Sequence, residues 1–507
     1  MQYFPPGGQL QEKTMNPKKA VIIGAGLGGL SAGIHLRNAG YAVEIYEKNA
    51  HVGGRLNVLR AEGFSFDLGP SILTLPHIFE RLFTGAGKQM ADYVKMQSLP
   101  VHWRNFFEDG NVIEFDRDRQ QMELNNPSLA ADDFRQLDNF LAYSRKLYAA
   151  ADCGYFRHGL ENLWQVIRCH GPLAALRDFD AFSVMNDGTR RHIRHVQLGN
   201  AINFFVKYVG SSAYQAPAIL NLLPHVQFHY GLWYTEGGLI KLAEGLHRLA
   251  TDIGVRIETN AEAVQLRHAG HRIDSVILKD GRVIAGDVII SNLEVIPTYV
   301  RLLGEDRRFL KPLDKFEPAC SGLVIDIGSR KQYPMLAHHN FFFSNDPKKH
   351  FRQVFKEYKL PDDPTVYVVA VTRTDKSQAP AGCENIKILP HIPYIQDRPY
   401  TREDYLELRE RVLLKLERMG LAGLRQNTVV EHMWTPDDIQ KTYGSHRGAI
   451  YGVVSDWRKN LGFKAPRKSG KYANLYFVGG SVNPGGGMPM VVLSGELAAA
   501  RIIHELQ

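Results

Sequence analysis

The sequence predicts an α/β protein in which a Rossmann-type dinucleotide-binding domain carries a second domain with a mixed β-sheet and a helical insert. Two glycine-rich segments, each between a predicted strand and a predicted helix, lie near opposite ends of the 507-residue chain. Between positions 316 and 434, four short runs are rich in β-branched and aromatic residues, as expected for strands. A chain of this length normally forms two or three domains, so more than one unit is expected.

The N-terminal glycine motif has the setting of a nucleotide-binding turn. A predicted strand over 20–23 leads into the motif, an apolar helix follows it, and a second strand over 42–46 ends at Glu47. In this G-x-G-x-x-G pattern, glycine permits the tight turn, the approach of a pyrophosphate and close packing of the helix. Glu47 is expected to accept hydrogen bonds from ribose hydroxyls, which argues against a 2′-phosphate. The alternative is a simple helix-packing turn. The motif glycines are Gly24, Gly26, Gly28 and Gly29.

The second glycine-rich segment follows a predicted strand over 475–478. A Gly/Pro loop over 479–487 comes next, and a helix is predicted from about Pro489 to Leu506. Consecutive glycines allow the backbone to approach a large planar ligand, and a helix N-terminus stabilises negative charge. The alternative is a glycine-rich surface loop.

Two further motifs indicate which cofactor this chain binds. Residues 52–55 read Val-Gly-Gly-Arg and residues 66–71 read Phe-Asp-Leu-Gly-Pro-Ser. With G-x-G-x-x-G and its acid, they resemble the FAD-binding amine-oxidase and phytoene-desaturase superfamily. This resemblance implies FAD as the cofactor, with Arg55 as a cationic donor to it rather than part of a surface salt bridge. The flavin-contacting residues that it implies are Gly24, Gly26, Gly28, Gly29, Glu47, Lys48, Gly54, Arg55, Gly69, Pro70, Ser71, Ala263, Gly479, Gly480, Gly487, Met488 and Pro489.

The predicted domains are not consecutive along the chain. The FAD-binding domain is expected to combine 18–72, 235–300 and 470–507. A helical insert over 100–234 that faces the substrate or a membrane, and a sheet-containing substrate domain over 301–469, complete the prediction. Residues 1–17 lack the apolar core of a secretory signal and are expected to form a disordered lead.

Composition excludes several function classes. Hydrophobic residues make up 44% and charged residues 22% of the chain, so a disordered or fibrous protein is excluded. No apolar stretch is long enough to span a bilayer. The formal net charge of +8 suits an anionic membrane surface or a nucleic acid, but no nucleic-acid-binding motif is present.

Two segments suggest contact with a membrane. The apolar segment 216–234 is either buried core or a functional surface, namely the wall of a lipophilic tunnel or a face that dips into a membrane. The basic run 456–472 is either a solvated loop or a contact with anionic lipid. The sequence therefore predicts a cytoplasmic protein that associates peripherally with the cytoplasmic membrane.

No metal site is predicted. The four cysteines, at positions 153, 169, 320 and 383, have no CxxC spacing. His225 and His229 lack a neighbouring carboxylate ligand, and adjacent His338 and His339 on a strand should point to opposite faces.

Nearly the whole chain resembles bacterial carotenoid desaturases and oxidases of the phytoene-desaturase type, and most closely the branch of 4,4′-diaponeurosporene (diapocarotenoid) terminal oxygenases. The segments that carry this resemblance are 68–79, 102–107, 207–212, 333–344 and 448–454. It implies that the terminal methyl group of a linear thirty-carbon carotenoid, such as diaponeurosporene or diapolycopene, is oxidised to an aldehyde, with molecular oxygen taking part. His338 or His339, before an aromatic strand, is the candidate catalytic proton relay.

Three alternatives to terminal oxidation remain at this point. The first is FAD-dependent desaturation of a diapophytoene- or phytoene-like carotenoid. The second is a non-enzymatic lipid carrier on the same fold, as in Rab escort and GDP-dissociation-inhibitor proteins, which the intact flavin motifs disfavour. The third is an amine oxidase, against which the apolar inserts count.

Overall fold

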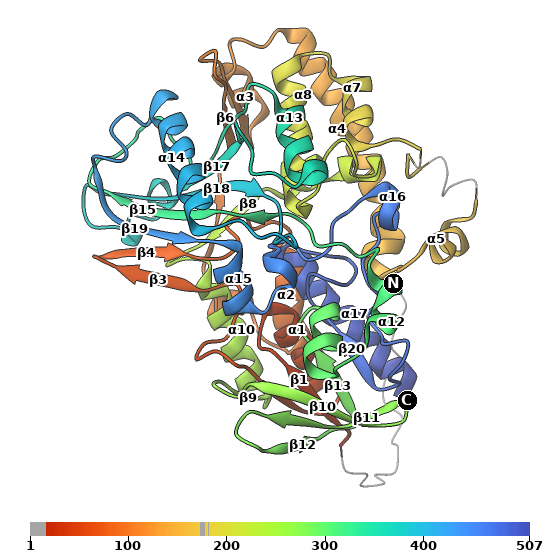
Figure 1. Cartoon of the computed structure of the whole chain (residues 1–507). Coiled ribbons are helices and arrows are strands. Elements are labelled where there is room, and N and C mark those ends of the chain that lie inside the picture. The colour runs from red at the N-terminus through yellow and green to blue at the C-terminus, as the bar shows by residue number, and fades with distance from the viewer. Residues whose placement is uncertain (1–16, 173–177, 181, 507) are drawn as a thin grey trace.

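The computed structural model describes residues 17–172, 178–180 and 182–506 (Figure 1). Apart from residue 17, the predicted disordered lead lies outside these residues. In the view of Figure 1 a small parallel sheet with its helices occupies the lower half, and a larger sheet with covering helices occupies the upper half.

The lower sheet is parallel and draws its five strands from distant parts of the chain. Every pair in it is parallel, and β1 is almost entirely buried, as central parallel strands are. The helices α1 (Leu27–Asn38), α10 (Ile240–Asp252) and α17 (Met488–Leu506) share one hydrophobic core with it. The strand order is β20 (Leu475–Phe477), β13 (Val288–Ser291), β1 (Lys19–Ile23), β2 (Ala42–Tyr46) and β9 (Arg256–Glu258).

Helices α1 and α17 lie against each other and so join the two ends of the chain (Figure 1). The contact is very close, because a Cβ atom on Gly495 would lie only 2.5 Å from the carbonyl oxygen of Gly28. The Ser31 hydroxyl also donates a 2.7 Å hydrogen bond to the Val492 carbonyl. The loops before both helices are therefore held side by side.

The upper sheet is mixed, because β16 pairs in parallel with β6 while the other neighbours are antiparallel. All four runs predicted as strands lie in this sheet. Its order is β19 (Thr428–Trp434), β15 (Val324–Ser329), β18 (Glu384–Ile392), β17 (Val366–Ala370), β16 (His339–Phe342), β6 (Val101–Phe106) and β7 (Val112–Asp116), with β14 (Ser321–Gly322) paired to β18. The interval 100–234, expected to be mostly helical, therefore begins with two strands, whose buried side chains join the core of the sheet.

Smaller elements complete the fold. The additional strands are β3 (Val58–Ala61), β4 (Phe64–Asp67), β5 (Met96–Leu99), β8 (Leu232–Thr235), β10 (Ala263–Ala269), β11 (Arg272–Leu278) and β12 (Val283–Ala285). The additional helices are α2 (Pro76–Gly85), α3 (Arg119–Asn125), α4 (Ala131–Ala151), α5 (Leu163–His170), α7 (Met185–His192), α8 (Val196–Asn203), α9 (Leu222–Tyr230), α11 (Val295–Pro297), α12 (Arg307–Leu310), α13 (Pro347–Arg352), α14 (Arg402–Arg418), α15 (Pro436–Tyr443) and α16 (Trp457–Asn460).

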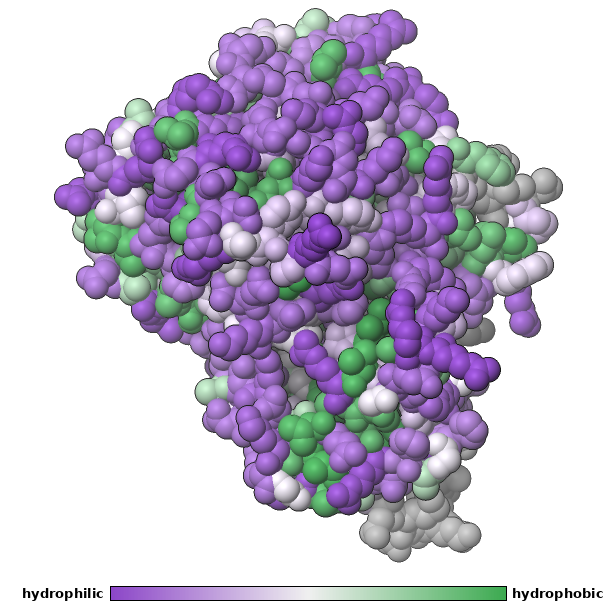
Figure 2. Space-filling model, in the orientation of Figure 1, coloured by the Kyte–Doolittle hydropathy of each residue, from purple (hydrophilic) through white to green (hydrophobic). Residues whose placement is uncertain are grey.

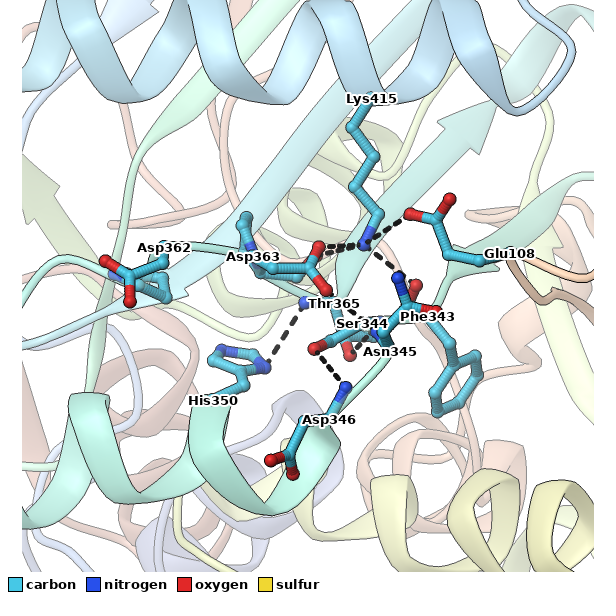
Figure 3. A network of polar contacts seen from close by, with 12 residues as sticks. Glu108, Phe343, Ser344, Asn345, Asp346, His350, Asp362, Asp363, Thr365 and Lys415 are labelled. Carbon is cyan, nitrogen blue, oxygen red and sulfur yellow. Dashed lines mark hydrogen bonds and ion pairs between the residues drawn. The ribbon is translucent and has the colours of Figure 1, made fainter.

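Helix α14 is fastened to the upper sheet by one buried lysine (Figure 3). Lys415 Nζ donates hydrogen bonds to the carbonyl oxygens of Phe343 (2.8 Å) and Pro364 (2.9 Å) and to Asp363 Oδ1 (2.5 Å). Glu108 adds a second carboxylate 3.6 Å away. Because Phe343 directly follows β16, this network fixes the end of the strand that begins at His339.

The apolar segment 216–234 is not a membrane-dipping face. It forms α9 and β8, and its side chains pack into two hydrophobic cores, with His229 as the one exposed residue of the segment. The interpretation of this segment as a membrane contact is therefore wrong, because tertiary packing covers its apolar surface.

The basic run 456–472 is largely neutralised within the fold. Lys464 and Arg467 are buried, and Lys459, Lys468 and Lys471 form ion pairs with Glu317, Glu505 and Glu305. These ion partners come from distant elements, so the run carries less unpaired positive charge than its sequence suggests, although Arg458 and Lys459 are exposed. No helix in the described part of the chain has the length and apolar character needed to cross a membrane.

Candidate functional site

The N-terminal glycine turn forms a cradle at the carboxyl ends of β1 and β13. Gly24 has φ +95° and donates its amide to the Tyr46 carbonyl at 2.8 Å. A Cβ atom on Gly26 would lie 2.5 Å from the Asn292 amide nitrogen, and one on Gly28 would lie 2.8 Å from the Asn292 amide oxygen. Both glycines therefore lie in close contact with the side chain of Asn292, a residue that sequence analysis missed. Its signal was a polar residue placed directly after a buried parallel strand.

Glu47 lies at the end of β2, beside this cradle. Its carboxylate accepts hydrogen bonds from the amides of Ala25 (2.8 Å) and Asn49 (2.9 Å), and the residue is 4% exposed. The Ala261 amide donates to the Glu47 carbonyl at 2.8 Å, which brings the start of β10, at Ala263, toward the same edge. Lys48 turns away and donates to the Lys441 carbonyl at 3.2 Å.

The Gly-Gly-Arg motif approaches the cradle from the opposite side. Gly54 has φ +60°, and its Cβ position lies 3.1 Å from Gly26 Cα. Arg55 donates to Glu294 Oε1 at 2.8 Å and to the Ile450 carbonyl at 2.7 Å. Both side chains are partly buried, so this is not a surface salt bridge. Burial raises the pKa of Glu294.

The Phe-Asp-Leu-Gly-Pro-Ser motif is held by a buried lysine from β18. Lys387 Nζ donates to the carbonyl oxygens of Asp67 (2.8 Å) and Gly69. Gly69 packs so closely that a Cβ atom would lie 1.9 Å from the Arg55 carbonyl oxygen, and Pro70 follows it directly. Lys387 was not predicted from sequence, because a lysine in an apolar strand has no local signature.

A small cavity is lined by residues of this motif and by His338, one of the two predicted catalytic histidines. Ser71, Tyr234, His338 and Lys387 are among its lining residues. His338 Nδ1 lies 2.7 Å from Thr374 Oγ1, and burial lowers the pKa of His338 to about 3, so its ring is neutral at physiological pH. The structure thus brings Ser71 and His338 to one cavity.

His339 lies beside His338 but has different partners. Its Nδ1 atom is 2.9 Å from the Tyr367 hydroxyl, whereas its buried Nε2 atom has no hydrogen-bond partner. Burial lowers the pKa of His339 well below its ordinary value. Across the described residues, no cluster of three or more His, Cys, Asp or Glu side chains is suited to hold a metal ion.

The C-terminal glycine segment closes the cradle on a further side. Gly479 has φ +102° and donates its amide to Ser494 Oγ at 2.8 Å. Gly480 packs against Gly452, where an added Cβ would lie 2.3 Å from the Gly480 carbonyl oxygen. Gly487 has φ +100°, and Met488 and Pro489 begin α17 as buried residues.

Buried polar atoms without partners lie near Arg55. Asp326 on β15 is fully buried, and neither of its carboxylate oxygens has a partner among the described residues. Burial raises the pKa of Asp326 to about 7, and Lys387 opposes this effect from the facing position on β18. Trp434 Nε1 and Tyr443 OH are also buried without partners.

These features fit FAD. Helix α1 begins without a side-chain cap and without an acid in its first turn, so its first amides can receive a pyrophosphate. The glycine positions leave bare backbone around it, and the Glu47 carboxylate lies at the end of β2, where the predicted contact with ribose would be made. The unpartnered polar atoms of Trp434 and Tyr443 suit a ligand with polar edges.

Comparison with known proteins identifies the family. The family model described as flavin containing amine oxidoreductase matches residues 27–318. This chain belongs to that family. It is 53% identical, over 97% of its length and 99% of the relative, to a protein of Methylomonas sp named 4,4′-diapolycopene oxygenase. A protein of Staphylococcus haemolyticus named 4,4′-diaponeurosporene oxygenase is 51% identical over 96% of this chain and 97% of its own.

The fold is shared with solved flavoprotein structures. Putrescine oxidase bound to putrescine superposes with a TM-score of 0.63 at 15% sequence identity, covering 96% of this chain and 99% of that chain. The predicted fold class, cofactor and enzyme class are confirmed: the protein is an α/β FAD-dependent oxidoreductase. The individual flavin contacts and the catalytic role of His338 and His339 stay predictions.

Proposed function

We propose that this protein is an FAD-dependent carotenoid oxygenase that oxidises the terminal methyl group of a linear thirty-carbon diapocarotenoid to an aldehyde. The observation that carries the proposal is identity of 50% or more, over nearly the whole chain, to relatives named diapolycopene and diaponeurosporene oxygenases. When bound, FAD would accept a hydride from a carbon atom of the substrate, and molecular oxygen would be the co-substrate.

The interior beside the cavity is suited to a polyene. Trp103, Phe205 and Phe341 form a cluster of fully buried rings, with ring centroids 4.1 and 4.7 Å from Trp103. Such walls exclude water and present flat apolar faces to a conjugated chain. His338 at the cavity is neutral, so its ring can donate or accept a hydrogen bond there.

Product analysis tests the proposed reaction. Purified holoenzyme is incubated with 4,4′-diaponeurosporene under isotopically heavy oxygen gas, and the products are measured by mass spectrometry. We expect a product that gains one oxygen atom and loses two hydrogen atoms at a terminal methyl group. Loss of hydrogen alone would instead identify a desaturase, and unchanged carotenoid bound to flavin-free protein would identify a carrier.

We propose further that helix α5 is the contact with a membrane surface, from which a lipid-soluble substrate would be withdrawn. Leu163 and Trp164 on this helix are 48% and 80% exposed, and nearby Phe182 is 83% exposed. Figure 2 shows hydrophobic residues at the right-hand edge, where α5 lies in Figure 1. The helix contains Arg168 and no acidic residue, as suits an anionic lipid surface. Our proposal is a peripheral association with the cytoplasmic face of the cytoplasmic membrane.

Flotation with vesicles that contain anionic phospholipid tests this contact. The double change Trp164→Ser and Phe182→Ser should reduce the vesicle-bound fraction at least about tenfold, because two large apolar side chains would be lost from the interface. Leu124→Ser is the matched control, since Leu124 is 75% exposed on α3. Equal binding of the double variant and the original protein would rule out α5 as the contact.

A further inference from the structure

Lys207 is a buried lysine enclosed by aromatic rings. It lies in the 3₁₀ helix Phe204–Val209 and is 3% exposed. Its Nζ atom is 3.3 Å from the ring centroid of Tyr367, 4.7 Å from that of Phe341 and 5.9 Å from that of Trp103. Among the described residues Nζ forms neither a hydrogen bond nor an ion pair, which is unusual for a buried lysine.

Other buried lysines of this protein have polar partners. Lys415 Nζ contacts a carboxylate and two carbonyl oxygens, and Lys464 Nζ donates to the Val453 carbonyl and the Ser455 hydroxyl. Those contacts account for their burial as structural anchors. Lys207 has no such anchor, so its amine is available to a ligand.

Two histidines share the surroundings of Lys207. His339 Nε2 is buried and unpartnered, and its Nδ1 atom contacts the Tyr367 hydroxyl. His391 is 4% exposed, and its Nε2 atom lies 3.4 Å from the Tyr451 hydroxyl. Lys207 acts electrostatically on both histidines.

Among the residues that the structure describes, no carboxylate acts on Lys207, His339 or His391. Burial lowers the pKa of Lys207 well below its ordinary value, and the nearby positive charge of Lys387 lowers it further. Burial likewise lowers the pKa values of both histidines. In its neutral form, which burial favours, Lys207 would carry a lone pair and two N–H donors.

The group borders both segments that face the flavin site. The Tyr367 hydroxyl lies close to Ser71, which follows the Phe-Asp-Leu-Gly-Pro motif. On the other side, an added Cβ on Gly486 would lie 2.5 Å from the Tyr451 carbonyl oxygen. Tyr367 and Tyr451, the partners of the two histidines, therefore lie close to the N-terminal and the C-terminal flavin segments respectively.

We propose that Lys207, His339 and His391 form a binding site for the oxygenated end of a polyene, either a terminal hydroxyl or an aldehyde. A hydrocarbon end makes no use of three buried bases, whereas a hydroxyl donates to a neutral amine or imidazole and an aldehyde oxygen accepts from their N–H groups. This inference rests on the proposed function, and it implies that a partly oxidised chain end is retained for the next oxidation.

Reductive trapping on the holoenzyme tests the site. The probe is crocetin dialdehyde, an acyclic polyene with an aldehyde at each end, followed by sodium cyanoborohydride. The Lys207 amine adds to the aldehyde carbon, water leaves as the C=N bond forms, and hydride from the reagent reduces that bond to a secondary amine. Peptide mass mapping should place the adduct on Lys207 at substoichiometric probe, before any surface lysine is labelled.

Lys207→Met should lose this adduct while keeping flavin absorbance and thermal unfolding temperature, and exposed Lys356→Met should keep it. Label confined to surface lysines of the original protein would overturn the inference, and this measurement needs no variant to fold. Trapping at Lys207 without oxygenated carotenoid in the product assay would contradict the proposed function alone. Normal carotenoid oxidation with Lys207 unlabelled would contradict the site alone.

Discussion

Gly29→Ala should yield protein that contains little or no flavin. A Cβ atom on Gly29 would lie 2.2 Å from the carbonyl oxygen of Gly24, a backbone atom that cannot move without opening the turn. Helix α1 must then shift away from β1, which displaces the amides at its N-terminus from the phosphate position. We expect a loss of about 1–3 kcal/mol in the free energy of unfolding of the apoprotein as well. The ratio of flavin to protein absorbance and thermal unfolding measure the two effects.

Gly85→Ala is the control for this change. Gly85 is also a helical glycine, at the end of α2, but no atom lies within 4 Å of its Cβ position. Alanine there should leave flavin content unchanged and stabilise the helix slightly, by about 0.5–1 kcal/mol. Normal flavin content in Gly29→Ala would show that the turn is not part of the cofactor site.

Lys415→Met should destabilise the protein more than any single surface change. The substitution keeps much of the side-chain volume but leaves the carbonyl oxygens of Phe343 and Pro364 and the Asp363 carboxylate without their donor (Figure 3). Breaking a buried pair by removing one partner costs about 3–5 kcal/mol, and the lower end applies because Asp363 is 37% exposed. Urea unfolding followed by circular dichroism measures the loss.

Lys356→Met tests whether the effect of Lys415→Met depends on burial. Lys356 is exposed, so its replacement should change the free energy of unfolding by less than about 0.5 kcal/mol. Similar unfolding curves for the two variants would mean that the lysine network does not anchor α14.

The nucleotide-binding half could be predicted from sequence because its chemistry depends on backbone conformation. Gly24 and Gly479 adopt positive φ, and Gly29 touches backbone, so each requirement is visible as a glycine at a fixed spacing. The acid at Glu47 follows from the same local unit. These features need no knowledge of distant contacts.

The residues that sequence analysis missed depend on such distant contacts. Lys387 donates a hydrogen bond to the Gly69 carbonyl, more than three hundred positions away in the sequence. Asp326 lies opposite Lys387 on the neighbouring strand β15. The ion pairs of the basic run could not be predicted for the same reason, since Glu305 and Glu317, which pair with Lys471 and Lys459, lie far away in the sequence. Charge composition does not reveal which acid pairs with which base.

The contact between α1 and α17 has a consequence for biosynthesis. Strand β20 and helix α17 are the last described elements to leave the ribosome, whereas β1 and α1 are among the first. Until β20 and α17 have been synthesised, the parallel sheet lacks its edge strand β20, and α1 lacks the face of α17 that packs against it at Gly495. The N-terminal part of the domain therefore leaves the ribosome with apolar surface exposed. The cradle is complete only after α17 has been synthesised.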